Sequence, residues 1–181
     1  LNLLEVVAGD EADAYSREID DCIERIQRHI DPDAELVFEN VRPDGGRLDG
    51  SEGRLLNPGH AIEAGWFLQH WAQRLDRPDL QNLATKIVRW MFETGWDEQH
   101  GGLFYFLDAA GKPPTQLEWF MKLWWPHTEA LYAHLLNYAL TGTEDDWAAF
   151  ERVHDYTFDR FPDPTHGGWF GYLDRTGTLT H

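Results

Sequence analysis

Two side chains capable of acid–base chemistry lie close together in the stretch LLNPGHAIEAGW, residues 55–66. His60 and Glu63 are three positions apart, which puts both on one face of a helix. Pro58 and Gly59 come immediately before them. Proline is favoured in the first turn of a helix, where the backbone N–H groups lack partners. Since imidazole and carboxylate groups both take and give protons in enzyme sites, the stretch predicts a candidate acid–base pair at the start of a helix.

The position of His60 also leads to an expectation for its pKa. The first turn of a helix carries a partial positive charge, which disfavours the imidazolium ion. We therefore expect the pKa of His60 to be lowered, so that the ring serves as a base near neutral pH. The alternative is structural, because a polar helix start followed by a first-turn glutamate is common without any catalytic role.

A second stretch, KLWWPHTEA at residues 122–130, has a related pattern. His127 and Glu129 fall in the first turn of another predicted helix, directly after Trp124 and Trp125. Sugars pack their C–H faces on aromatic rings while their hydroxyls need hydrogen-bond partners. The combination therefore favours a sugar pocket in which Trp124, Trp125 and His127 contact the substrate. The alternative is that the tryptophans pack in the core and the polar residues cap the helix.

The motif D-x-x-H-G-G occurs twice, with Asp97 and His100 in one copy and Asp163 and His166 in the other, 66 residues apart. Aspartate and histidine are metal ligands, but paired glycines indicate a turn that needs positive φ angles. In such a turn the polar side chains satisfy the backbone. We favour this structural interpretation.

A metal site is also conceivable elsewhere, from His60, Glu63, His127 and Glu129 acting together as ligands of zinc or manganese. No compact H-E-x-x-H or C-x-x-C motif accompanies these residues. We therefore predict that the protein binds no metal.

The elements that must position these residues are mainly helices. Apolar residues at three- and four-residue steps predict five of them. Their approximate ranges are 15–30 with Asp10 as cap, 58–75, 80–92 closed by Gly95, 126–140 closed by Gly142, and 147–161 with Thr143 as cap. A further short helix is predicted over 117–123. Short β-like segments at 35–41, 103–108 and 169–174 lie between the helices.

The repeated turn motif indicates an internal repeat of helix, helix, glycine turn and short hairpin. A weaker echo, LVFENVRPDGGRLDG, occurs at residues 36–50. Repeats of this size are typical of stacked or closed helical arrays. We expect an all-α fold, an α/α barrel, with an open helical solenoid as the alternative. Three repeats make half of a six-pair ring, so residues 1–181 are expected to be part of a single barrel domain, truncated at both ends.

Composition narrows the possible partners. The chain has 15 basic and 32 acidic side chains, a formal net charge of −17. This charge opposes binding to nucleic acid or to an anionic membrane face. A single cysteine, Cys22, excludes an internal disulfide framework and fits a reducing compartment. With no long apolar run in the sequence, we expect a cytoplasmic protein that acts on a small molecule.

Several long motifs, in order over nearly the whole chain, resemble the N-acylglucosamine 2-epimerase family. They are NPGHAIEAGWFL, GWDEQHGGLFYFLD, PTQLEWFMKLWWPHTEA and WFGYLDRTG. The resemblance implies an (α/α)6 barrel, of which this chain covers roughly the C-terminal half, with the active site in the central cavity. It implies that the enzyme interconverts the amino sugars N-acetylglucosamine and N-acetylmannosamine, without a cofactor, and forms a homodimer. ATP is an effector in some members, and no residue here is assigned to it.

The resemblance also implies roles for individual residues. His60 corresponds to one of two acid–base histidines, Glu63 lies in the same P-G-H-x-x-E motif, and Glu129 occupies a functional position of W-W-P-H-x-E. We therefore expect catalytic roles for these three residues. The family's second histidine follows the W-F-G-Y-L turn, and the sequence reaches His181 before that motif appears.

Three other functions remain open. An aldose–ketose isomerase, or a cellobiose or mannose 2-epimerase of the same superfamily, would use similar groups. A non-catalytic binding or regulatory protein would use the same barrel without turnover. A glycoside hydrolase would need two carboxylates flanking one bond, and no such pair is as well marked in the sequence as the His60 region.

Overall fold

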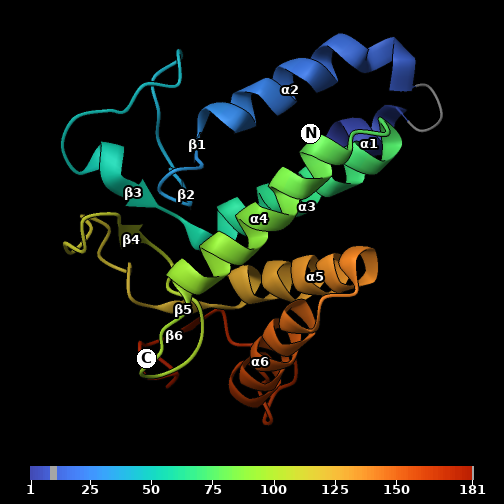
Figure 1. The fold of residues 1–181 in the computed structure, drawn as a ribbon. Coiled ribbons are helices and arrows are strands. Elements are labelled where there is room, and N and C mark those ends of the chain that lie inside the picture. The colour runs from blue at the N-terminus through green and yellow to red at the C-terminus, as the bar shows by residue number, and fades with distance from the viewer. Residues whose placement is uncertain (9–11, 181) are drawn as a thin grey trace.

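The computed structural model describes residues 1–8 and 12–180, and its main elements are helices (Figure 1). The α-helices are α1 (Asn2–Ala8), α2 (Ser16–Arg28), α3 (Pro58–Arg74), α4 (Pro78–Gly95), α5 (Trp124–Thr141) and α6 (Glu144–Arg160). Two short 3₁₀ helices are η1 (Ala12–Tyr15) and η2 (Glu52–Arg54). The expected cap Asp10 and the terminal His181 lie outside the described residues. The five predicted long helices are confirmed as α2 to α6, with ends that shift by a few residues.

The helix boundaries follow from local chemistry. Asn57 caps α3, because its side-chain oxygen accepts a hydrogen bond from the backbone N–H of His60 at 3.1 Å. Gly142 ends α5 in the left-handed conformation at φ 66°. Thr143 occupies the cap position of α6 as predicted, although its side chain makes no cap hydrogen bond.

The prediction of a short helix over residues 117–123 is wrong. This segment forms turns and then the strand β5 (Lys122–Leu123). Lys122 and Leu123 pair with β6 (Tyr172–Leu173), so the chain is extended directly before α5. Helix α5 then begins at Trp124, two residues before the predicted start at Pro126.

Among the described residues, the strands have two residues each and form three antiparallel pairs. The remaining strands are β1 (Ile30–Asp31), β2 (Leu36–Val37), β3 (Leu55–Leu56) and β4 (Leu107–Asp108). The pairs are β1–β2, β3–β4 and β5–β6. The last two are not the local hairpins that the sequence predicts, since β4 pairs back to the strand before α3 and β6 pairs back to the strand before α5. Each of these pairs thus joins the two ends of one helix–helix unit.

The internal repeat is more regular than the sequence indicates. Three turns recur at 66-residue intervals, each closed by a backbone hydrogen bond between residues nine apart, with N···O distances of 2.8–2.9 Å. These hydrogen bonds run from Phe38 to His29, from Phe104 to Gly95 and from Phe170 to Phe161. The first turn contains DPDAELVF, so the proposed echo at residues 36–50 is misplaced. There Glu35, at φ 56°, occupies the position that Gly101 and Gly167 take in the other two turns.

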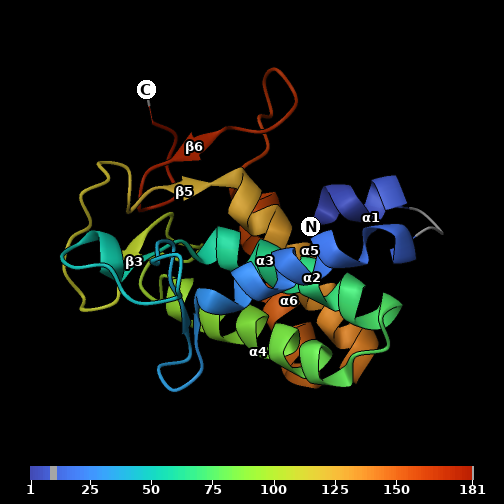
Figure 2. The ribbon, with the colours of Figure 1, turned by 90° about the horizontal axis from the view of Figure 1, so that it is seen from above.

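Helices α3 and α4 pack as one antiparallel pair and α5 and α6 as another, while α3 also contacts α5 along its length (Figure 1). The strands gather at one end of these helices, the end where α3 and α5 begin (Figures 1 and 2). Contacts between α3 and α5 advance together along both helices, so the two run parallel. The contacting pairs are His60 with Trp125, Trp66 with Glu129, and His70 with Tyr132. The starts of both helices therefore lie side by side.

Candidate active site

His60 lies at the start of α3 with 49% of its side chain exposed. Its Nδ1 atom is 3.0 and 3.1 Å from the two carboxylate oxygens of Glu39. One side of the ring faces the indole of Trp125, with centroids 5.1 Å apart and planes inclined by 31°. A cavity of about 240 Å³, lined by His60, Glu39, Asn57 and the end of α2, opens beside it. His60 is thus oriented by two neighbours and still reachable by a ligand.

The pKa of His60 is raised, not lowered as the sequence predicts. The hydrogen bond to Glu39 is the largest cause, and it outweighs the opposing effect of partial burial. The negative charges of Glu39 and Glu63 act in the same direction. The two carboxylates therefore have a larger effect on the pKa of His60 than the positive end of the helix. Only one of them, Glu63, is near His60 in the sequence.

Gly59 allows Trp125 to reach His60. A Cβ atom at position 59 would lie 2.8 Å from two ring carbons of Trp125 and 2.9 Å from Pro126. Such distances are shorter than van der Waals contact, so the α3–α5 approach at this point requires glycine. The same Trp125 ring meets Tyr105 edge-on, with centroids 6.2 Å apart.

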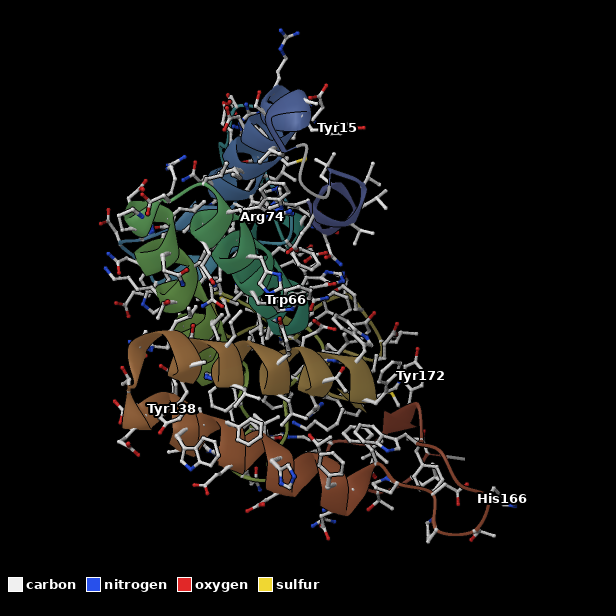
Figure 3. All side chains as sticks on the ribbon, turned by 90° about the vertical axis from the view of Figure 1, so that its right-hand side faces the viewer. Tyr15, Trp66, Arg74, Tyr138, His166 and Tyr172 are labelled. Atoms are coloured by element: carbon white, nitrogen blue, oxygen red, sulfur yellow. The ribbon has the colours of Figure 1, made fainter. Side chains whose placement is uncertain are left out.

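Glu129 lies one helical turn further along α5 and is partly buried. Its Oε2 atom accepts a hydrogen bond of 2.7 Å from the indole N–H of Trp66, which lies between α3 and α5 (Figure 3). Burial raises the pKa of Glu129, with a further contribution from Glu63, while the Trp66 hydrogen bond opposes the rise. The structure therefore brings His60, Glu63, Glu129 and Trp125 to one region, where the carboxyl of Glu129 holds its proton more tightly than usual.

Trp124 and His127, the two remaining residues predicted to contact the substrate, differ in their exposure. Trp124 is 45% exposed and is available to a ligand. His127 is fully buried: its Nδ1–H donates to the carbonyl of Leu123 at 2.6 Å, and its Nε2 accepts from the backbone N–H of Leu103 at 2.9 Å. Burial lowers its pKa to about 3. The prediction that His127 contacts substrate is therefore wrong, because both ring nitrogens bind backbone and no surface is left.

The repeated turn motifs are structural, as predicted. The carboxylate of Asp97 accepts hydrogen bonds from the backbone N–H groups of Gln99 and His100, and Asp163 serves the third turn in the same way. Across the described residues, no group of three or more side chains is arranged to hold a metal ion. None of the helices in that same part of the chain combines the length and apolar character needed to cross a bilayer.

Glu39 is the site residue that the sequence did not reveal. It belongs to the extended segment ELVFENV and is 21 positions before His60. Its β-branched and aromatic residues are typical of a β-like segment, but nothing in the segment indicates which helix start the carboxylate will face.

Comparison with known proteins identifies a family that matches nearly the whole chain. Residues 3–181 match the family model described as N-acylglucosamine 2-epimerase (GlcNAc 2-epimerase). Over 183 aligned residues the chain is 50% identical to the N-acylglucosamine 2-epimerase of Bos taurus and 48% identical to that of Rattus norvegicus. These alignments cover 99% of this chain but only 43% and 44% of the two relatives, so the chain spans less than half of their length.

Among solved structures, cellobiose 2-epimerase from Bacillus thermoamylovorans B4167 superimposes with a TM-score of 0.78 at 21% identity, covering 94% of this chain and 42% of that one. This likeness confirms the expected fold class, helix pairs of the α/α barrel type.

Proposed function

This chain belongs to the N-acylglucosamine 2-epimerase family, and on that premise we propose that it carries part of the active site of a sugar 2-epimerase. The proposed reaction interconverts N-acetylglucosamine and N-acetylmannosamine by removal and return of the proton on C2. Residues 1–181 would form part of a single (α/α)6 barrel catalytic domain. The named activity of the bovine and rat relatives supports this assignment.

The chemistry requires a base beside an opened sugar. The hydrogen on C2 is weakly acidic, so the ring must open first and let the C1 aldehyde delocalise the negative charge as an enolate. A base on one face removes the proton, and an acid on the other face returns one, which inverts the configuration at C2. Donors that hold the developing oxyanion lower the barrier further.

In this chain His60 would exchange the proton at C2. The observation that carries the proposal is its half-exposed imidazole, held between Glu39 and Trp125 at the mouth of a cavity. Glu63 and Glu129 would orient sugar hydroxyls or assist ring opening. Trp124 and Trp125 would form aromatic walls against the C–H faces of the sugar.

The proposed reaction uses no metal and no cofactor, since histidine and carboxylate groups are enough to move the protons. A cytoplasmic location and a homodimeric assembly are part of the same proposal. They rest on the low cysteine content and on the family.

The decisive experiment follows the C2 proton in the full-length protein that contains this chain. In deuterated buffer with a chelator present, wild-type enzyme is expected to exchange the C2 hydrogen of N-acetylmannosamine for deuterium, as followed by proton NMR. His60→Ala is expected to reduce this exchange by at least about a hundredfold. His166→Ala is the matched control, because its ring lies 80% exposed in a distant turn (Figure 3).

Three outcomes would count against the proposal. Near-normal exchange in His60→Ala removes that histidine from the mechanism. Loss of exchange on chelation, restored by Zn²⁺ or Mn²⁺, shows a metal-dependent reaction. Conversion of mannose to a ketose, without epimerisation of N-acetylmannosamine, identifies an isomerase, in which the proton returns to C1.

A further inference from the structure

We propose that Glu39 is the positioning residue of the acid–base histidine, fixing the proton of His60 on Nδ1 and leaving Nε2 to exchange protons with the substrate. This inference rests on the proposed function, because it assigns a second residue to the same proton transfer.

The hydrogen-bond geometry determines the tautomer. An ionised carboxylate only accepts hydrogen bonds, and both oxygens of Glu39 lie within 3.1 Å of Nδ1. Nδ1 must therefore carry a proton in the neutral ring, and the lone pair of the neutral base is on Nε2. A carboxylate that holds one ring nitrogen in this way orients the imidazole and stabilises the imidazolium that forms when Nε2 takes a proton.

Glu39 is itself held in place by the element that starts the catalytic helix. Its backbone N–H donates to the carbonyl of Leu55 at 2.9 Å, and Leu55 belongs to β3, which directly precedes α3. The neighbouring Phe38 N–H donates to the carbonyl of His29 at 2.9 Å, in the first of the three repeated turns. The carboxylate and the imidazole thus rest on one backbone framework, which is why their separation is well defined.

The charges around His60 all favour its protonated form. Glu39 comes from the segment after β2 and Glu63 from α3, and both raise the pKa of His60. Trp125 from α5 and Tyr105 from the second turn are uncharged near neutral pH, and His29 lines the same cavity at the end of α2. A reversible epimerisation needs a base in one direction and an acid in the other. A raised pKa suits both, because it brings the two protonation states closer in free energy near neutral pH.

The test measures the pH dependence of kcat/KM in both directions, together with the titration of the His60 ring by NMR, in the full-length protein. Glu39→Gln keeps a hydrogen-bond acceptor but removes the charge. We expect the His60 titration to move to lower pH by about one to three units, since an opposite charge at this distance shifts a pKa by that much. The acid limb of kcat/KM should move with it in the direction where His60 is the base, and the alkaline limb in the direction where His60 is the acid. We expect the plateau of kcat to fall as well, because a neutral amide stabilises the imidazolium less.

Two further variants separate positioning from structure. Glu39→Asp keeps the charge on a shorter side chain, and it is expected to restore part of the acid limb. Glu98→Gln removes an exposed carboxylate that pairs with Arg152 on α6, and it is expected to leave the profile unchanged. Should Glu39→Gln fail to fold, Glu39→Asp still decides the issue, since its His60 titration must lie below that of the wild type if the hydrogen bond matters.

The outcomes distinguish this inference from the proposed function. If His60→Ala abolishes exchange while Glu39→Gln leaves both the acid limb and the His60 titration unmoved, Glu39 has no positioning role and the epimerase assignment stands. If His60→Ala retains exchange, the proposed function fails, whatever the effect of Glu39. A shift in the titration and the acid limb, partly restored by Glu39→Asp, supports both.

Discussion

At the scale of single residues, two carboxyl groups set the protonation around the candidate site in different ways. Glu39 accepts a hydrogen bond from the ring of His60 and so favours imidazolium. Glu129 is partly buried beside Glu63, and this environment raises the pKa of its own carboxyl group. In enzyme sites, different surroundings give neighbouring groups different pKa values, so that one group acts as the acid and another as the base.

Glu129→Gln is expected to lower kcat on the order of a hundredfold, the lower end of what a positioned acid–base group contributes. The amide keeps the size of the side chain and can still accept from Trp66, but it cannot transfer a proton. Steady-state kinetics with N-acetylmannosamine measures the effect.

Trp66→Phe provides the comparison. It removes the indole donor that stabilises the ionised form of Glu129, so the pKa of Glu129 rises further while the carboxyl remains. We expect a smaller loss of kcat, with any limb due to Glu129 moved to higher pH. A Glu129→Gln enzyme that turns over at the wild-type rate would return Glu129 to a purely structural role.

The sequence predicts those features of the site that depend on neighbouring residues in the chain. It does not predict features that depend on residues distant in the sequence. The placement of His60 and Glu63 on one helix face follows from their spacing. The protonation of His60 does not follow from the sequence, because Glu39 is brought close to His60 by the backbone hydrogen bond from its N–H to the carbonyl of Leu55 in β3. His127 has the same local signature as His60, a histidine just after a proline in the first turn of a helix, yet it is buried against Leu103 and Leu123. Catalytic or binding roles remain predictions for five residues: His60, Glu63, Glu129, Trp124 and Trp125.

At the scale of elements, the second and third turns each connect the end of a helix pair to a strand that pairs back to the start of the same pair. In the second turn Gly102 lies at φ 75° with a Cβ position 2.6 Å from the ring of Tyr156. In the third turn Gly168 has the same φ of 75° and nothing within 4 Å of its Cβ position. The two glycines therefore separate backbone strain from steric crowding.

Gly168→Ala is expected to cost about 1–2 kcal/mol of unfolding free energy, from the left-handed backbone alone. Gly102→Ala is expected to cost about 1–3 kcal/mol more, because the added methyl also displaces Tyr156. Urea unfolding of both variants of the full-length protein measures the difference. Equal losses at the two positions would show that Tyr156 moves aside freely.

The two glycine-marked turns were visible in the sequence because glycine is the usual residue at positive φ. The first turn cannot be recognised from the sequence, because a glutamate, Glu35, adopts that conformation there at φ 56°. The β pairing could not be read either, since strands of two residues carry too little alternation to specify partners about 50 residues away. The helices, with apolar stripes over three or more turns, were predicted to within a few residues.

At the scale of the whole molecule, a buried ionic cluster joins three distant segments. The carboxylate of Asp97, in the second turn, lies 3.1 Å from Nζ of Lys122 and 3.0 Å from Nε of Arg175. Lys122 is fully buried in β5, and its ammonium group lies over the ring of Phe104 at 3.8 Å. The cluster therefore links the end of the α3–α4 pair to the start of α5 and to the segment after β6.

This cluster makes stability depend on pH. Burial opposes ionisation of Asp97, but the hydrogen bonds and charges of Arg175 and Lys122 prevail and lower its pKa from 3.8 to about 2. A lowered pKa contributes stability above the unfolded value and loses it as pH falls toward the folded value. We expect Asp97 to contribute about 2 kcal/mol at neutral pH that disappears between about pH 4 and pH 2.

The measurement compares unfolding free energies of wild type and Asp97→Asn across this range. At neutral pH the variant is expected to lose about 3–5 kcal/mol, because it leaves the buried ammonium of Lys122 without its charge partner. The gap between the two proteins should narrow by about 2 kcal/mol toward pH 2. Asp163→Asn, the equivalent in the third turn, removes a carboxylate that is paired with the exposed His166 and not with a buried lysine, so it should show a smaller gap. A gap for Asp97→Asn that stays constant with pH would contradict the assigned role.

The closure of each helix pair by its own strands has an evolutionary consequence. Residues 109–121 lie between β4 and β5 and so belong to neither closed unit. Within this stretch Trp119 accepts a backbone hydrogen bond from Phe106 and faces Phe104, next to Tyr105 and its contact with Trp125. Insertions or exchanges there can remodel the wall near the candidate site without shifting either helix start. Preference for one sugar over another is thereby free to diverge while the proton-transferring groups keep their alignment.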